Sequence, residues 1–167
     1  LIDNRKYAER IMVDLTNIMG TETGSYVIIV GSEGIASHNQ WADEAVKWQQ
    51  ENFPNLKFLG KLPVGEDRNA TYRNVNKLLS EHPELQGIVC FGSESGPGVG
   101  RALKENSQRR DIAVVAACTP NVCRDDIKSG YIKELLLWDP ADAGVLQTYI
   151  APLVLQGRQD EIKPGMR

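Results

Sequence analysis

The sequence predicts an α/β fold, in which a doubly wound and mainly parallel five-stranded sheet is flanked by helices. Five short runs of aliphatic and β-branched residues carry this prediction, because each is too short for a helix and typical of a buried strand. An amphipathic stretch separates each run from the next, and consecutive parallel strands require such a crossover. The expected strands are 26–30, 56–59, 88–91, 112–117 and 135–138, the last lying in an extended segment over 132–138.

The stretches between the runs predict helices. The first is expected over 3–19, where Ile11, Leu15 and Ile18 form one apolar stripe and Gly20 provides the end. The others are expected over 39–52, around 72–79, through 99–103, over 120–130 and around 145–153. Thr119 is the expected N-cap of the helix that begins at Pro120. Pro152 is expected to kink or shorten the last helix. Residues 156–167 are polar and are expected to form a tail.

Length and composition indicate an ordinary globular chain. It has 167 residues, which suits one domain or one domain with a fragment of another. It is 41% hydrophobic and 25% charged, with a net charge of −3 and both signs interspersed. Nucleic acid is not an expected partner, because its recognition needs a concentrated basic face. No apolar stretch approaches the roughly 20 residues that span a bilayer.

The three cysteines are expected to be free thiols. Cys90 lies inside a predicted strand, where a buried and inert thiol is typical. For Cys118 and Cys123 the alternatives to free thiols are a disulfide between them or a metal site, but two thiols at this spacing are not a recognised metal-ligand set.

Glycine-rich loops give no sign of nucleotide or nucleophile chemistry. The chain has no Gly-x-x-x-x-Gly-Lys-Ser/Thr loop, and its 96–100 segment, Gly-Pro-Gly-Val-Gly, has the wrong spacing and follows the third strand. We interpret that segment as a tight turn before a helix that needs glycine dihedral angles. The 92–96 segment, Gly-Ser-Glu-Ser-Gly, lacks the central serine of a hydrolase elbow.

Titratable residues do not form a catalytic or metal-binding set in the sequence. Of the two histidines, His82 precedes Pro83 at a helix end and is expected at the surface, whereas His38 follows the first strand. Glu66 and Asp67 are interpreted as charges at a helix N-terminus or in solvent. The chain is therefore not expected to be an enzyme, and no cofactor or metal is predicted.

The loops that follow parallel strands gather along one sheet edge, where ligands bind. These loops carry hydroxyl, amide, imidazole and aromatic side chains, which suit a sugar or polyol that presents hydroxyls at its rim and C–H groups on its face. The candidate ligand-binding residues are Ser37, His38, Asn39, Phe91, Ser93, Thr119, Trp138 and Asp139. Structural roles remain as alternatives: sheet core for Phe91 and Trp138, helix capping for Asn39 and Thr119. Trp41 is expected in the core because it shares a helix face with Ala45 and Trp48.

Several segments resemble type I periplasmic sugar-binding proteins of ABC transporters, most closely the rhamnose and autoinducer-2 binding branch. These are 37–41 (Ser-His-Asn-Gln-Trp), 82–88, 119–121 (Thr-Pro-Asn) and 137–144. The resemblance implies two α/β lobes that close over the ligand. Residues 1–138 would form the second lobe, and 139–167 a crossover helix and tail that pack with a first lobe absent from this chain. Autoinducer-binding relatives carry an acidic residue near the position of Ser37, so this site departs from theirs.

The resemblance implies a solute-binding protein that acts with a membrane permease in the periplasm or another extracytoplasmic space. We expect no signal peptide within these residues, because residues 3–6 are predicted to open a charged helix. Two alternatives remain: the sugar-sensing domain of a transcriptional regulator of the lac-repressor type, which uses the same two-lobe fold, and a flavodoxin-like sugar-processing enzyme.

Overall fold

The strands form one parallel sheet with the order β2-β1-β3-β4-β5, as seen in a computed structural model that describes residues 3–163. Every pair of neighbouring strands is parallel, which confirms the predicted doubly wound fold. The strand order changes direction at β1, with β2 on one side and β3 on the other. The point between β1 and β3 is thus the topological switch point, where doubly wound sheets bind ligands. The strands are β1 Gly24–Val30, β2 Leu56–Pro63, β3 Leu85–Phe91, β4 Ala113–Ala117 and β5 Glu134–Leu135.

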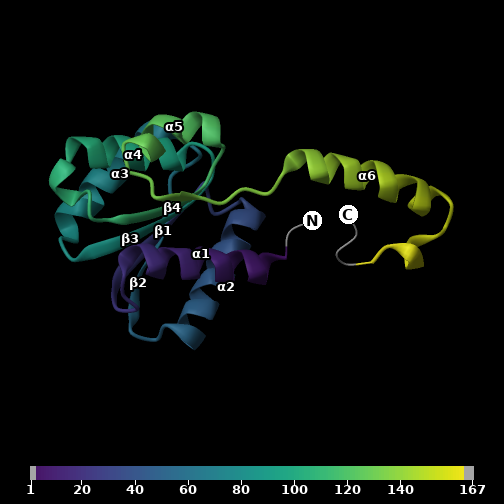
Figure 1. Ribbon diagram of the computed structural model, residues 1–167, viewed down its shortest axis with the longest axis horizontal. Helices are drawn as coiled ribbons and strands as arrows, with labels where there is room; N and C mark the ends of the chain where they lie inside the picture. The colour runs from purple at the N-terminus through teal and green to yellow at the C-terminus, as the bar shows by residue number, and fades with distance from the viewer. Residues whose placement is uncertain (1–2, 164–167) are drawn as a thin grey trace. The chain divides into compact units, whose positions relative to one another are not determined.

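Helices cover both faces of the sheet (Figure 1). One face carries α1 (Asn4–Met19) and α2 (Ala36–Asn52), and the other carries α3 (Arg68–Glu81), α4 (Ser95–Glu105) and α5 (Pro120–Lys128). Successive strand residues point to opposite faces, so Ile28 packs under α1 and α2 whereas Ile29 packs under α3 and α4. Because both faces are covered, the central strands are apolar almost without interruption.

Helix ends follow the local chemistry of the sequence at most positions. The Asp3 carboxylate accepts a hydrogen bond from the Lys6 N–H at the start of α1, and Gly20 ends that helix in the left-handed region at φ 68°. Helix α2 begins at Ala36 rather than at residue 39. Asn39 therefore lies in its first turn, where the side-chain amide donates hydrogen bonds to loop carbonyls instead of capping the helix.

The prediction of a long fifth strand is wrong. Only Glu134 and Leu135 pair with β4, at the outer edge of the sheet, and Leu137 and Trp138 are exposed. At the opposite edge β2 is longer than predicted and reaches Pro63, whose missing N–H is tolerated on an edge strand.

The glycines of α4 do not form the expected entry turn. They lie inside the helix, and none of Gly96, Gly98 and Gly100 has a positive φ. Their role is close packing: a Cβ on Gly98 would lie 2.5 Å from Thr71 Cβ and 2.8 Å from the Arg68 carbonyl oxygen. The sequence thus allows α3 and α4 to approach each other closely.

The chain divides into two units at the Leu137–Trp138 bond. The second unit holds α6 (Pro140–Leu155), which continues through Pro152, and a short 3-10 turn over Gln159–Glu161. None of its described residues is buried, although α6 carries several large apolar side chains. Within residues 3–163, no helix combines the length and apolar character needed to cross a membrane.

Candidate ligand-binding site

The centre of the sheet edge is occupied by a carboxylate from the loop after β2. Gly31 follows β1 and Gly92 follows β3, so both lie at the switch point. A Cβ on Gly31 would lie 2.6 Å from Glu66 Oε1, and a Cβ on Gly92 would overlap the same oxygen. The Glu66 carboxylate thus lies against both glycines, in space that two side chains would otherwise fill.

The backbone holds Glu66 in this position. Val64 N–H donates to the Val30 carbonyl at 3.0 Å, which fixes the loop to the end of β1. The Asp67 carboxylate then caps α3 by accepting from the Asn69 and Ala70 N–H groups. Between these anchors Glu66 has φ 54°, the only positive φ of a non-glycine residue in the described part of the chain. Such strained residues concentrate at ligand-binding sites.

His38 lies beside this carboxylate on the first turn of α2. Its Nδ1 accepts a hydrogen bond from the Gly31 N–H at 3.2 Å and lies 3.5 Å from Glu66 Oε1. An Nδ1 that accepts from Gly31 carries no proton, so this is the neutral tautomer with its proton on Nε2, and the Glu66 contact is not a hydrogen bond. Burial lowers the pKa of His38, and the Glu66 charge opposes this only in part. The Nε2–H has no hydrogen-bond acceptor among the described residues and can donate to a ligand.

Aromatic rings lie next to His38. The centroids of Trp41 and Phe91 are 5.7 and 6.4 Å from that of His38, and 5.6 Å from each other. Phe91 is fully buried, whereas Trp41 is half-buried and offers apolar surface at the edge. Tyr7 packs against Trp41 with a centroid distance of 5.1 Å, and burial raises its pKa to about 12. The cluster is thus a rigid aromatic base beside the carboxylate and the imidazole.

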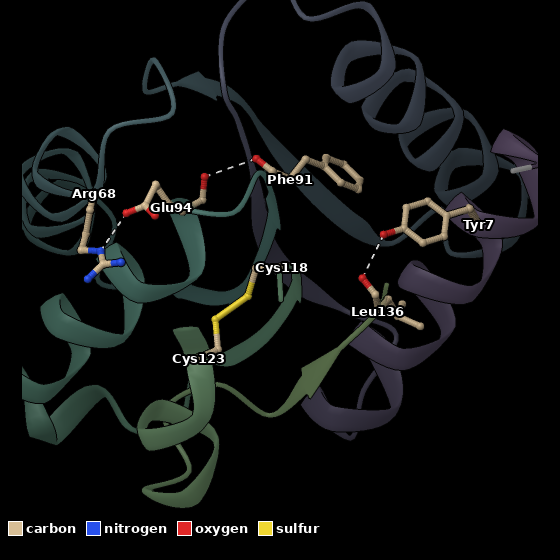
Figure 2. The surroundings of a disulfide bond; sticks show 8 residues. Tyr7, Arg68, Phe91, Glu94, Cys118, Cys123 and Leu136 are labelled. Carbon is tan, nitrogen blue, oxygen red and sulfur yellow. Dashed lines mark hydrogen bonds and ion pairs between the residues drawn. A yellow bond between two sulfur atoms is a disulfide. The ribbon is translucent and has the colours of Figure 1, made fainter. Parts of the chain in front are cut away.

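The Tyr7 hydroxyl also ties this cluster to the last strand. It donates a hydrogen bond to the Leu136 carbonyl at 3.1 Å, and Figure 2 shows the hydroxyl pointing directly at that oxygen. Leu136 lies just before the boundary between the two units. One side chain of α1 therefore contacts both the rings of the edge and the segment that leaves the sheet.

The structure brings some of the predicted residues together and not others. His38 and Phe91 lie in the central cluster. Ser37, in the first turn of α2, and Ser93 and Thr119, on loops, are exposed at the same edge. Thr119 is at the N-cap position of α5 without a side-chain capping bond. Asn39 is engaged with its own loop. Trp138 and Asp139 belong to the second unit, where Asp139 caps α6 by accepting from the Ala141 N–H at 2.8 Å.

Sequence reasoning missed Glu66 as a site residue. Its position next to the capping residue Asp67 made a helix-terminal charge the natural interpretation. The preceding Gly65, with φ 70°, was the available sign that the chain turns sharply here. Trp41 was assigned to the core, and its ring does pack there while keeping an exposed side.

The expectation of free thiols at Cys118 and Cys123 is wrong. The two sulfur atoms form a disulfide, because Cys118 directly follows β4 and Cys123 lies one turn into α5, beneath it in Figure 2. Both are packed against Gly96, where a Cβ would lie 2.9 Å from Cys123 Sγ. Cys90 is a free, buried thiol, as predicted, and burial raises its pKa.

The donor set at this edge suits a polyhydroxylated ligand. A carboxylate accepts from hydroxyl groups, an imidazole N–H donates to them, and an aromatic face contacts C–H groups. In the described residues no group of three His, Cys, Asp or Glu side chains is arranged to hold a metal ion.

Comparison with known families agrees with this chemistry. The periplasmic binding protein domain matches residues 1–159. The chain belongs to this family. A D-apiose import binding protein of Paraburkholderia graminis is 28% identical over 121 residues, which cover 70% of this chain and 36% of that protein.

Solved periplasmic binding proteins share the fold. A solute-binding protein of an ABC transporter from Agrobacterium vitis, bound with α-D-tagatopyranose, is 23% identical with a TM-score of 0.83 over 94% of this chain and 52% of its own. One from Burkholderia graminis, in complex with D-arabinose, is 22% identical with a TM-score of 0.82 over 97% of this chain and 56% of its own. The chain thus spans about half of these structures. The names of these relatives describe them as binding proteins for sugar import or as solute-binding proteins of ABC transporters. None of them is described as binding rhamnose or autoinducer-2, so that branch stays a prediction.

Proposed function

We propose that the chain is one lobe of the solute-binding component of a sugar importer, and that its sheet edge forms one side of the sugar cleft. The observation that carries the proposal is the placement of His38 next to both Glu66 and Trp41 at the switch point, where Glu66 lies against Gly31 and Gly92. This location follows from the topology, and the side chains are those that a neutral polyol requires.

Each group in the proposed site has a separate task. The Glu66 carboxylate accepts from sugar hydroxyls, and the Nε2–H of His38 donates to a hydroxyl or ring oxygen. The half-exposed Trp41 contacts the C–H face of the sugar. Phe91 supports these rings from below, because its own side chain is fully buried. Exposed Ser37, Ser93 and Thr119 add hydroxyls at the rim.

We assign residues 1–138 to the second lobe and 139–167 to a crossover helix and tail. The exposed apolar side chains of α6, among them Val145 and Tyr149, support this, because such a helix needs a partner. Trp138 and Asp139 then stand at the crossing between lobes, where the ligand bridges the two and favours the closed state. The family's role in import implies an extracytoplasmic location and a membrane permease as partner.

Calorimetric titration of the chain with D-arabinose, D-galactose, L-rhamnose and D-ribose tests the proposal. One lobe offers about half of the contacts, so we expect weak binding, with a Kd of about 1 mM or above. Trp41→Leu should abolish the heat of binding. The control is Trp48→Leu on the same helix, because that ring packs on Phe53 away from the edge. Micromolar binding by the chain alone would contradict a shared cleft, and no binding of any of the four sugars would contradict this sugar site.

A further inference from the structure

The charges around the switch point are unbalanced, and this has consequences for the kind of sugar that the edge accepts. Two cations stand near the edge, Lys61 on β2 and Arg68 at the start of α3. Lys61 Nζ lies 2.9 Å from Asp43 Oδ1, and Arg68 Nε lies 2.9 Å from Glu94 Oε2. Figure 2 shows the Arg68–Glu94 pair turned toward each other. Neither cation neutralises Glu66, and the adjacent His38 is kept neutral by burial.

Glu66 also occupies the place that an anionic ligand would take. In doubly wound sheets, glycine loops and helix N-termini at the switch point form a natural anion site. Here the loops after β1 and β3 supply those glycines, Gly31 and Gly92, and helices α2, α3 and α4 begin at this edge. The Glu66 carboxylate lies against both glycines and is held there by a strained backbone. The protein has therefore filled its own anion site with a side chain.

We propose that Glu66 is a specificity-determining residue that excludes anionic sugars, such as uronates and sugar phosphates, and admits neutral ones. This inference rests on the proposed function, because it assumes that sugars bind at this edge. An anionic group near Glu66 meets a like charge that neither Lys61 nor Arg68 pairs with, whereas a hydroxyl in the same place donates a hydrogen bond to it. The discrimination requires no steric difference between the sugars.

One matched pair of sugars, a neutral one and its anionic counterpart, tests the inference. D-galactose and D-galacturonate have the same ring and differ in a neutral or a carboxylate group at C6. We expect D-galacturonate to bind the chain roughly tenfold more weakly, as for two like charges about 5 Å apart in a medium between protein surface and water. Two-dimensional NMR titration of the 167-residue chain measures both Kd values even where binding is weak.

Glu66→Gln removes the charge and keeps the shape, so the ratio of the two Kd values should fall to about two or below. The matched control is Glu33→Gln, which removes an equal charge from an exposed residue of the neighbouring β1–α2 loop and should leave the ratio unchanged. The wild-type chain gives a second test that does not depend on the folding of a variant. For this chain, the ratio of the D-galacturonate Kd to the D-galactose Kd should decrease in about 1 M salt, where charges are screened within roughly 3 Å.

The outcomes separate the two proposals. If D-galactose shifts the resonances of the edge and D-galacturonate binds as tightly, the charge inference is overturned and the sugar site stands. If a ratio near ten survives both Glu66→Gln and high salt, Glu66 is not its source and the inference again fails. If neither sugar shifts any resonance of the edge, while the chain remains folded, the proposed function itself fails.

Discussion

Residues 3–137 and residues 138–163 are helical or strand-forming to a similar degree, but they use their apolar side chains in opposite ways. The first unit buries them in two cores, one on each face of the sheet. The second unit has none of its described residues buried, and Leu155 of α6 is 87% exposed. The stability of the chain therefore comes from packing in the first unit, because tertiary packing supplies most of the stability of helices in proteins.

The largest expected contrast is between two leucine substitutions. Leu15→Ala opens a cavity under α1, where Leu15 is completely buried, and should lower the free energy of unfolding by about 2–5 kcal/mol. Leu155→Ala removes a similar side chain from α6 and should change it by less than about 0.5 kcal/mol. Denaturant unfolding of both variants measures the difference. Equal losses of unfolding free energy in the two variants would show that Leu155 is packed like Leu15, and would contradict the contrast between the two units.

A pair of glycine substitutions should change stability in opposite directions. Gly98→Ala places a Cβ against Thr71 and the Arg68 carbonyl, so we expect a loss of about 1–3 kcal/mol. Gly144 in α6 has nothing within 4 Å of its added Cβ, and Gly144→Ala should stabilise that helix by about 0.5–1 kcal/mol. Circular dichroism during thermal unfolding reports both. Stabilisation by Gly98→Ala would contradict the close approach of α3 and α4.

Removing one hydroxyl tests the link between α1 and the end of the sheet. Tyr7→Phe leaves the Leu136 carbonyl without its donor and should cost about 1 kcal/mol of unfolding free energy. Tyr149→Phe removes a hydroxyl from a residue that is 69% exposed and should have no measurable effect. Hydrogen exchange of residues 134–137 should also quicken in the Tyr7 variant alone. Unchanged exchange there would mean that this hydrogen bond does not hold the segment.

The smallest expected effect is a pH dependence from His38. Its pKa in the folded chain is lowered by burial, so the folded state binds fewer protons there than the unfolded state. The stabilisation is complete above the ordinary pKa of about 6.5 and is lost as the pH falls toward the lowered value. The stability advantage of the wild type over His38→Gln should therefore shrink between about pH 8 and pH 5. An advantage that grows on acidification would mean that the Glu66 charge outweighs burial.

The sheet was predictable because buried parallel strands leave long apolar runs, and the helix ends at Gly20 and Pro120 follow from backbone chemistry. The early end of β5 was not predictable. The apolar residues Leu137 and Trp138 continue the pattern of a strand, but only Glu134 and Leu135 pair with β4. His38 could be placed on the ligand edge because it follows the first predicted strand closely in the sequence. Glu66 could not, because its role depends on two glycines 35 and 26 residues away that only the fold brings against it.

The central claim is that the edge around Gly31 and Gly92 forms one side of a sugar cleft. Two-dimensional NMR of the chain titrated with D-arabinose tests it most directly, residue by residue. We expect progressive chemical-shift changes for the amides of Gly31, Gly92 and His38 and for the indole N–H of Trp41. The resonances of the Trp48 indole and of the α6 amides should not shift. Shifts confined to other parts of the chain would contradict the account.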